Sequence, residues 1–335
     1  MRALGVSDTV IEGHDDAELI GLAGDLQWTQ DLSYTLEELS SSTGAGVEQI
    51  RSIFRLLGLD ADELAGFDDD DAEMVALVIS DTSGILDEIG AQLLRVAGAA
   101  LNRIAEATVA AYVQDVEEQL GDASDPVMLA EQNATASALG MALGKNLSTV
   151  FKHHMLTAIR RQRLAQRDVP SPELVRQAVG FVDLVGFTAL SHAASPAELI
   201  ATIEDFERHA FETASNLGGR VVKSIGDEVM IAGPDAATVA AIALHLVRHT
   251  DCDPSVAPRG GVSAGDVLFR LGDYYGPVVN LASRLVDEAI PGEVLTDQHT
   301  VDGSNLEVRP AGRRVLKGFP DPLTVWSIDG PATDG

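Results

Sequence analysis

The chain has 335 residues, including 52 Asp and Glu and 23 Lys and Arg, so its formal net charge at pH 7 is −29. This excess of negative charge argues against nucleic acid or an anionic membrane surface as the main partner. With 45% hydrophobic and 22% charged residues, the composition is that of a globular protein rather than a disordered one.

The acidic residues are unevenly distributed along the chain. Residues 1–145 hold 28 acidic and 6 basic residues, a net charge of −22, whereas residues 146–335 hold 24 and 17, a net of −7. Because the length suits two domains, we expect these parts to be different domains. The single cysteine, Cys252, cannot form an intrachain disulfide, and we expect a cytoplasmic protein with no signal peptide and no integral membrane segment.

The first part of the chain has the apolar periodicity of helices, and Pro126 is the only proline between residues 16 and 166. The acidic run at residues 68–71 is expected to cap the N-terminus of a helix in water. Residues 85–109 have the broad apolar face of a long helix. The sequence therefore predicts an all-α bundle over residues 1–145.

Residues 39–58 look like a helix-turn-helix of the kind that reads DNA. The net charge of −22 in this part of the chain opposes DNA binding, so a packed pair of helices is the better interpretation. We expect no nucleic-acid partner.

Residues 133–167 are unusual for this chain, because they contain six basic residues and no acid. The cations could simply gather at a helix C-terminus, which favours positive charge. Alternatively, residues 146–170 form a linker helix that switches between a docked and an extended state. His153 and His154 lie on it and could titrate near neutral pH, although a buried core histidine is the simpler interpretation of His154.

Beyond residue 170, short Val- and Ile-rich runs alternate with amphipathic stretches. This pattern predicts an α/β or α+β domain over residues 171–335. The expected strands lie at residues 178–184, 220–225, 228–232, 261–263, 293–296 and 323–328, and the expected helices at 196–216 and 236–249.

Two motifs in this domain place an acid at a turn. In residues 180–188, Asp183 lies near the end of an apolar strand that leads through a turn into a helix. A buried carboxylate there needs a metal or hydrogen-bond donors, and the N–H groups of the turn could bind a phosphate. Residues 221–231 predict a hairpin whose turn carries Gly226 and Asp227.

A third motif, at residues 272–284, leads into a helix on which Asn280 and Arg284 share one face. Taken singly, these residues have simpler interpretations: Asp183 as a helix cap, Lys223 as a partner of Asp227, and Asn280 as an exposed polar side chain.

In this order and combination, the three motifs resemble the catalytic domain of the class III nucleotidyl cyclases over about residues 177–328. The resemblance implies a ferredoxin-like α+β catalytic domain. Further landmarks lie at residues 259–267, 291–294, 314–319 and 323–326. The sequence departs from the family at Pro277 and Val278, where Asn-Thr or Asp-Thr is common, and this puts the geometry of that loop in doubt.

The resemblance implies that Asp183, Asp227 and the backbone of Leu184 hold two Mg²⁺ or Mn²⁺ ions. One ion would acidify the ribose 3′-hydroxyl for attack on the α-phosphorus, and the other would neutralise the triphosphate and the leaving pyrophosphate. The backbone at Phe187 and Thr188 would bind the phosphates. Asp183, a water and the substrate phosphate are all candidates to accept the 3′-hydroxyl proton.

By the same resemblance, Asn280 orients the ribose, Arg284 stabilises charge that grows on the α-phosphoryl oxygens, and Lys317 binds phosphate. Lys223 and Asp273 occupy the two positions that read the base. A donor and an acceptor match N1 and the 6-amino group of adenine, whereas guanine presents the inverse pattern. ATP is therefore the expected substrate, and 3′,5′-cyclic AMP and pyrophosphate are the expected products.

Two alternatives stay open: a guanylate cyclase, if Lys223 and Asp273 do not read the base, and a catalytically inactive module that binds nucleotide for signalling. In the family, the metal-binding aspartates of one chain work with the base-reading and Asn/Arg residues of another, which implies a homodimer with two equivalent sites. Residues 19–167 resemble the helical regulatory domain of some soluble bacterial members. This second resemblance implies autoinhibition and a response to pH and, in some members, to fatty acids or other lipids.

Overall fold

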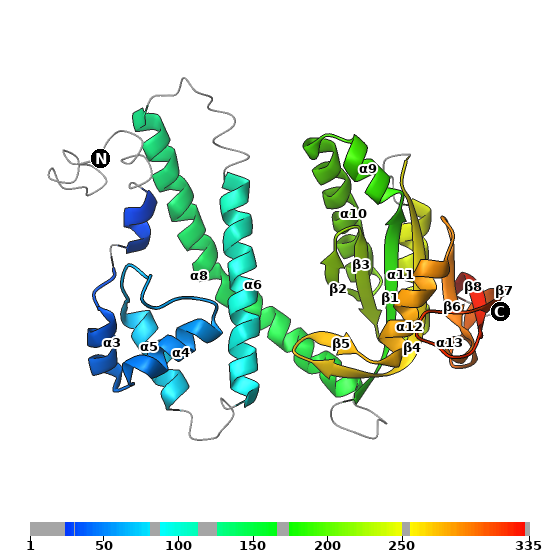
Figure 1. Ribbon diagram of the computed structural model, residues 1–335, viewed down its shortest axis with the longest axis horizontal. Coiled ribbons are helices and arrows are strands. Elements are labelled where there is room, and N and C mark those ends of the chain that lie inside the picture. Colours follow the sequence, from blue (N-terminus) through cyan, green and yellow to red (C-terminus); the bar gives the residue numbers. More distant parts are fainter. Residues whose placement is uncertain are drawn as a thin grey trace. The chain divides into compact units, whose positions relative to one another are not determined.

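The computed structural model describes residues 24–29, 31–80, 88–112, 126–165, 174–249 and 255–331. It divides into two compact units, Met1–Met155 and Leu156–Gly335 (Figure 1). No helix within these described ranges is long and apolar enough to cross a membrane.

The described residues of the first unit form helices joined by turns and loops, with one isolated β-bridge between Tyr34 and Phe67, which confirms the expected all-α first part. Its helices are α3 (Leu36–Thr43), α4 (Val47–Leu56), α5 (Asp69–Ile79), α6 (Glu88–Tyr112) and most of α8 (Pro126–Ala165). Leu39, Ile50 and Phe67 form the centre of a core shared by α3, α4 and α5. Residues 146–165 of the expected linker are the second part of α8, a single helix of 40 residues.

The acidic run at residues 68–71 begins α5. Asp68 is the N-cap: its side chain accepts a hydrogen bond from the Asp71 N–H (2.9 Å), and its own N–H donates to the Asp71 side chain (3.0 Å). The remaining carboxylates lie in the first turn, where the helix dipole favours negative charge. The prediction that this run caps a helix is confirmed.

The segment that looked like a helix-turn-helix is a packed pair, α3 and α4, joined through Gly44 in a left-handed conformation (φ 75°). Arg51 of α4 pairs with Glu48 at 2.5 Å and with Asp62 at 2.8 Å. The guanidinium is therefore engaged by two carboxylates of its own chain.

The second unit is a mixed β-sheet with helices on both faces, which confirms the expected α+β class. The strand order is β2-β3-β1-β4-β6-β8-β7, with β5 paired to β4. Strands β4 and β6 are parallel, and the other paired strands are antiparallel. The strands are β1 (Leu174–Val185), β2 (Arg220–Ile225), β3 (Glu228–Gly233), β4 (Ala257–Arg270), β5 (Asp273–Tyr275), β6 (Val294–Asp297), β7 (Leu306–Arg314) and β8 (Leu323–Pro331). The helices are α9 (Phe187–Ala193), α10 (Pro196–Asn216), α11 (Ala236–His249), α12 (Pro277–Glu288) and α13 (Gln298–Asp302), preceded by the end of α8.

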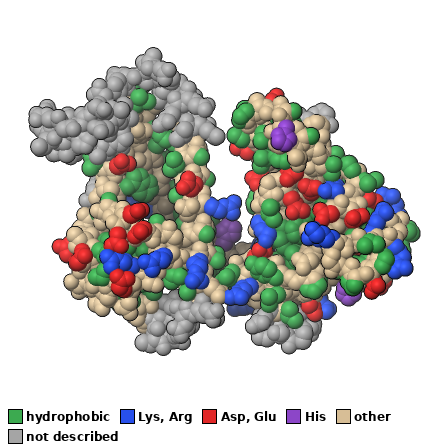
Figure 2. Space-filling view, viewed as in Figure 1, with side chains coloured by type: hydrophobic (Ala, Val, Ile, Leu, Met, Phe, Trp, Pro, Cys, Tyr) green, Lys and Arg blue, Asp and Glu red, His purple; other side chains and the backbone are tan. Residues whose placement is uncertain are grey.

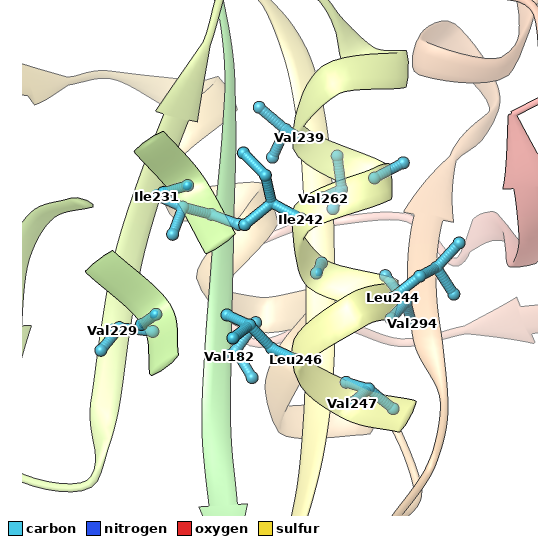
Figure 3. Packing of buried hydrophobic residues seen from close by; sticks show 14 of the residues in the cluster. Val182, Val229, Ile231, Val239, Ile242, Leu244, Leu246, Val247, Val262 and Val294 are labelled. Atoms are coloured by element: carbon cyan, nitrogen blue, oxygen red, sulfur yellow. The ribbon is translucent and has the colours of Figure 1, made fainter. Parts of the chain in front are cut away.

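Helix α11 packs directly on one face of the sheet. Its Ile242 and Leu246 belong to one buried cluster with Val182 of β1 (Figure 3). The approach is close because residue 180 is a glycine: a Cβ there would lie 2.8 Å from the Val239 side chain. The apolar face of α11 thus fixes the position of the central strand.

Helix α12 covers the opposite face. Ala282 and Val286 of α12 are buried together with Val179 and Phe181 of β1. Because side chains alternate along a strand, β1 contributes to a core on each side of the sheet. A strand buried on both faces provides a rigid support for Asp183 near its end.

Candidate active site

Two aspartates meet at one end of β1. In the pairing of β1 with β3, Asp183 lies opposite Glu228, which directly follows Asp227. The Leu184 N–H donates to the Asp227 carbonyl over 3.3 Å, so the first two motifs are joined through the backbone. Gly226, with φ of 64°, allows the two-residue turn between β2 and β3 that presents Asp227.

Carboxylates crowd around this end of β1. Burial, with a further contribution from the charge of Asp183, raises the pKa of Asp227. Burial, followed by the charges of Asp183 and Asp287, raises the pKa of Glu228 to about 7. On the visible face of the second unit, acidic side chains gather with basic ones among them (Figure 2). Acids that oppose one another's ionisation make an environment in which a divalent cation is strongly favoured.

The donor set at this end of β1 fits Mg²⁺ or Mn²⁺. Asp183 and Asp227 supply carboxylate oxygens, and Leu184, whose side chain is buried, can supply its backbone carbonyl. Across the described parts of the chain, no group of three or more His, Cys, Asp or Glu side chains is arranged to hold a metal ion. Phosphate oxygens and water would therefore have to complete the coordination of an ion held here.

Arg259 is a site residue that sequence reasoning missed. It lies opposite Asp183 in the pairing of β1 with β4, and its Nε (3.0 Å) and Nη2 (2.9 Å) both contact Oδ2 of Asp183. Its Nη1 donates to the carbonyls of Asp287 and Ala289, at 2.8 and 3.2 Å. Arg259 begins residues 259–267, one of the segments in which the sequence resembles the family, but only the strand register shows which carboxylate it faces.

Lys223 of β2 and Asp273 of β5 form an ion pair, with 2.5 Å between Nζ and Oδ2. Both side chains are partly exposed, at 38% and 24%. The Tyr274 N–H donates to the second oxygen of Asp273, and the Tyr274 hydroxyl accepts from Arg220. Lys223 thus pairs with Asp273 rather than with Asp227, the simpler partner considered from sequence.

Helix α12 carries the third motif. It begins at Pro277, directly after the N-cap Gly276 (φ 121°), so the proline occupies a first helical position, which it suits. Asn280 is exposed one turn later. Arg284 follows after another turn and binds Asp287 at 2.9 Å. The residue that departs from the family pattern, Pro277, is therefore compatible with the start of this helix.

The other predicted residues are spread over both units. Phe187 and Thr188 form the first turn of α9, where backbone N–H groups have no intrahelical acceptor. Lys317 is exposed in the turn between β7 and β8, beside the buried Leu316. His153 and His154 are exposed on α8 in the first unit, so the interpretation of His154 as a buried core residue is wrong for this chain.

The predicted site residues fall into separate groups within one chain. No hydrogen bond or ion pair among the described residues joins Asp183 or Asp227 to Lys223 or Asp273. Arg284 is connected to Asp183 only indirectly. Its side chain binds the Asp287 carboxylate, and the Asp287 carbonyl accepts a hydrogen bond from Arg259, the partner of Asp183. Within the described residues of one chain, the predicted metal ligands and the predicted base-reading residues are therefore not joined by a hydrogen bond or ion pair.

Residues 170–330 match the family described as the adenylate and guanylate cyclase catalytic domain. An uncharacterized protein of Mycobacterium tuberculosis is 32% identical over 97% of this chain and 87% of its own length. An adenylate cyclase of Glutamicibacter nicotianae is 31% identical over 79% of this chain and 70% of its own. A protein of Mycobacterium tuberculosis named as a pH-sensitive adenylate cyclase is 27% identical over 88% and 78%. All three similarities extend into the helical first part.

Proposed function

The chain belongs to the class III adenylate cyclases, and we propose that it converts ATP to 3′,5′-cyclic AMP and pyrophosphate by two-metal-ion catalysis. The observation that carries the choice of ATP is the contact between Lys223 and Asp273. It places one donor and one acceptor side by side, which is the pair that N1 and the 6-amino group of adenine require. A guanine in the same place would leave polar groups unpaired.

In this proposal, Asp183, Asp227 and the Leu184 carbonyl hold two Mg²⁺ or Mn²⁺ ions. When bound, the ions acidify the 3′-hydroxyl and neutralise the triphosphate. The chain's own groups do the rest of the positioning. The first turn of α9, at Phe187 and Thr188, directs backbone N–H groups at the phosphates, because such groups lack partners at a helix start.

The remaining roles in the proposal concern the ribose and the reacting phosphate. Asn280 holds the ribose, and Arg284 stabilises negative charge on the α-phosphoryl oxygens as it develops. Lys317, on the exposed turn after β7, binds the outer phosphates. Because charge on the α-phosphoryl oxygens grows as the reaction proceeds, the contact with Arg284 is stronger in the transition state than in the bound substrate.

We further propose that the enzyme works as a homodimer with two equivalent sites. The support is the separation of Asp183 and Asp227 from Lys223 and Asp273 within one chain. A second copy, related by a twofold axis, would bring the base-reading group of one chain to the metal-binding group of the other.

In this proposal, the first unit inhibits the cyclase activity of the same chain, and a bound lipid changes the degree of inhibition. A cavity of about 910 Å³ lies between α6 and α8. Ile104, Leu139 and Leu143 contribute to its apolar lining, and Gln132 contributes a buried side-chain oxygen that has no hydrogen-bond partner in the described residues. An apolar chain with a hydroxyl or protonated carboxyl group would satisfy both features, so a fatty acid or similar lipid fits.

The proposal also includes a cytoplasmic location, where ATP is supplied. It further includes a response to pH through His153 and His154. Both histidines are exposed on α8, the helix that runs from the first unit into the second. If His154→Ala leaves the pH profile of cyclase activity in the full chain unchanged, this part of the proposal is wrong.

The test of the function is an assay of the purified full-length chain with Mn²⁺ and either ATP or GTP, with products separated by chromatography. We expect cyclic AMP from ATP, and loss of activity by about a hundredfold or more in Asp227→Ala, which removes a metal ligand. Asp266→Ala, at a partly exposed aspartate of β4, is the matched control. Cyclic GMP as the main product would show a guanylate cyclase, and no product from either nucleotide would show an inactive module.

A further inference from the structure

Three arginines line a pocket at the junction of α8 and the sheet. The pocket has a volume of about 360 Å³ and lies within the second unit. Arg161 comes from the end of α8, Arg176 from β1 and Arg220 from the start of β2. Ala165, one turn after Arg161, packs against the core on the α12 face of the sheet, which holds the end of α8 in place.

Within the described part of the chain, two of these arginines have no carboxylate partner. Arg220 donates to the Tyr274 hydroxyl at 2.9 Å, and its guanidinium carbon lies 5.1 Å from the centre of the Tyr274 ring. Among the described residues, no acidic side chain contacts Arg161 or Arg220, whereas Arg176 pairs with Asp266. Burial and the charge of Arg220 both lower the pKa of Arg161. Neighbouring cations are thus left uncompensated in a chain of 52 acidic and 23 basic residues.

Apart from Gln177, whose side-chain amide donates to the Gly233 carbonyl, the rest of the lining is apolar or backbone. Leu164, Ala232 and Pro234 contribute hydrocarbon surface, and the backbone of glycines 218, 219 and 233 also lines the pocket. A volume of several hundred Å³ is in the range that small organic ligands occupy. An inorganic anion alone would leave the hydrocarbon surface in contact with water, so the lining favours an anion that carries an organic group.

The pocket is separate from the proposed catalytic site. Arg220 is the first residue of β2, whereas Asp227 follows the opposite end of that strand. The base-reading Lys223 lies between them, three residues after Arg220. Tyr274, the partner of Arg220, directly follows Asp273, the partner of Lys223. A ligand on Arg220 would therefore act next to the base-reading pair without entering the metal site.

We propose that this pocket binds a small organic phosphate, whose oxygens accept hydrogen bonds from Arg161 and Arg220 while its organic group contacts Leu164 and Pro234. Arg176, already paired with Asp266, lies at the rim. Such a ligand joins the last turn of α8 to β2, and so connects the helix that leaves the first unit with the strand that carries Lys223. The inference concerns a second site and does not depend on the proposed cyclase activity.

The test is a binding titration of the full-length protein in EDTA and without ATP, with phenyl phosphate and inorganic phosphate as probes. Calorimetry gives the affinities, and hydrogen exchange of peptides covering residues 156–165 and 218–223 locates the site. We expect phenyl phosphate to bind more tightly than inorganic phosphate and to protect both peptides. Arg161→Gln, an exposed position, is expected to weaken binding about tenfold, as the loss of a charge-assisted contact does.

Arg163→Gln changes an exposed arginine of the same helix that does not line the pocket, and should leave the affinity within about twofold of the wild type. Lys317→Gln should also leave the affinity unchanged, because Lys317 belongs to the proposed catalytic site and does not line this pocket. Arg220→Gln is a second variant with the same expected loss as Arg161→Gln. The proposal is overturned if neither probe protects the two peptides, if Arg161→Gln and Arg220→Gln bind as the wild type does, or if Lys317→Gln abolishes binding.

Discussion

Arg259 holds Asp183 through two N–H groups that converge on one carboxylate oxygen, at 3.0 and 2.9 Å. The third nitrogen of the guanidinium binds two carbonyls at the end of α12, those of Asp287 and Ala289. A single arginine therefore neutralises a predicted metal ligand and ties it to the helix that carries Arg284. A divalent cation that takes the same oxygen supplies the charge that the guanidinium otherwise provides.

This relationship predicts a metal-dependent effect on stability. Arg259→Gln is expected to lower the free energy of unfolding by about 1–3 kcal/mol in EDTA, because Asp183 and Glu228 lose a neighbouring cation. Mn²⁺ should recover most of this loss, which urea unfolding with and without the metal would measure. Arg176→Gln removes an exposed pair with Asp266 and should cost less than about 1 kcal/mol in both conditions. Equal losses for Arg259→Gln in EDTA and Mn²⁺ would contradict the prediction.

The raised pKa of Glu228, about 7 against an ordinary 4.5, predicts how stability depends on pH. Below pH 4.5 the carboxyl is protonated in both the folded and the unfolded chain, so it has no effect. Between pH 4.5 and about 7 the unfolded chain releases its proton first, and stability falls as pH rises; above that window the loss is constant.

Glu228→Gln removes this titration. The free energy of unfolding of the variant minus that of the wild type should therefore be larger at pH 8 than at pH 5. Urea unfolding in EDTA at both pH values measures this difference. Glu207→Gln, on α10, is a control that should show little difference between the two pH values. A Glu228→Gln effect that is the same at pH 5 and pH 8 would show that the carboxyl has no raised pKa.

The contact between Lys223 and Asp273 predicts the basis of nucleotide choice. Lys223→Met removes the donor and should reduce the preference for ATP over GTP, expressed as the ratio of kcat/KM values, by about tenfold or more. Arg176→Gln, on β1, should leave this ratio unchanged because Arg176 pairs with Asp266 instead. If Lys223→Met lowers activity toward both nucleotides equally, Lys223 does not read the base.

The shared-site proposal predicts complementation between two inactive chains. Asp227→Ala lacks a proposed metal ligand, and Asn280→Ala lacks the proposed ribose contact, so each homodimer should be inactive. A mixed dimer contains one site in which both residues are intact. Random co-assembly should therefore restore up to about a quarter of wild-type activity, measured as cyclic AMP formed after co-expression. Absence of any recovery in dimers verified to be mixed would rule out a site shared between chains.

Local signals in the sequence were sufficient for the elements that present the site. The hairpin whose turn carries Asp227 is marked by Gly226 between two Val/Ile-rich runs, and α10 is marked by Ser195 and Pro196, which form its N-cap and first position. The acidic cap of α5 was equally local. In each case, the residues that determine the conformation lie within a few positions of one another.

The features that the sequence did not reveal depend on tertiary contacts. Strand β4 has 14 residues instead of the three expected, because glycines hide its pattern; at Gly261 a Cβ would lie 2.4 Å from the backbone of α12. Strand β7 was missed because it contains Pro310 and Gly312, which an edge strand tolerates. The role of Arg259 requires the register of β1 with β4, which no local pattern encodes.

The cavity between α6 and α8 predicts a lipid-binding defect that can be separated from misfolding. Ala136 lines the cavity, so Ala136→Phe should fill part of it and weaken the binding of a fluorescent long-chain fatty acid by about tenfold or more. Ala138→Phe introduces the same side chain at an exposed position two residues along α8 and should bind the probe normally. Gln132→Leu tests the polar end of the cavity: it should weaken the binding of a long-chain alcohol but not of a hydrocarbon of the same length, because only the alcohol has a hydroxyl that can donate to the Gln132 oxygen. Equal affinities of Ala136→Phe and Ala138→Phe for the probe would place the lipid elsewhere.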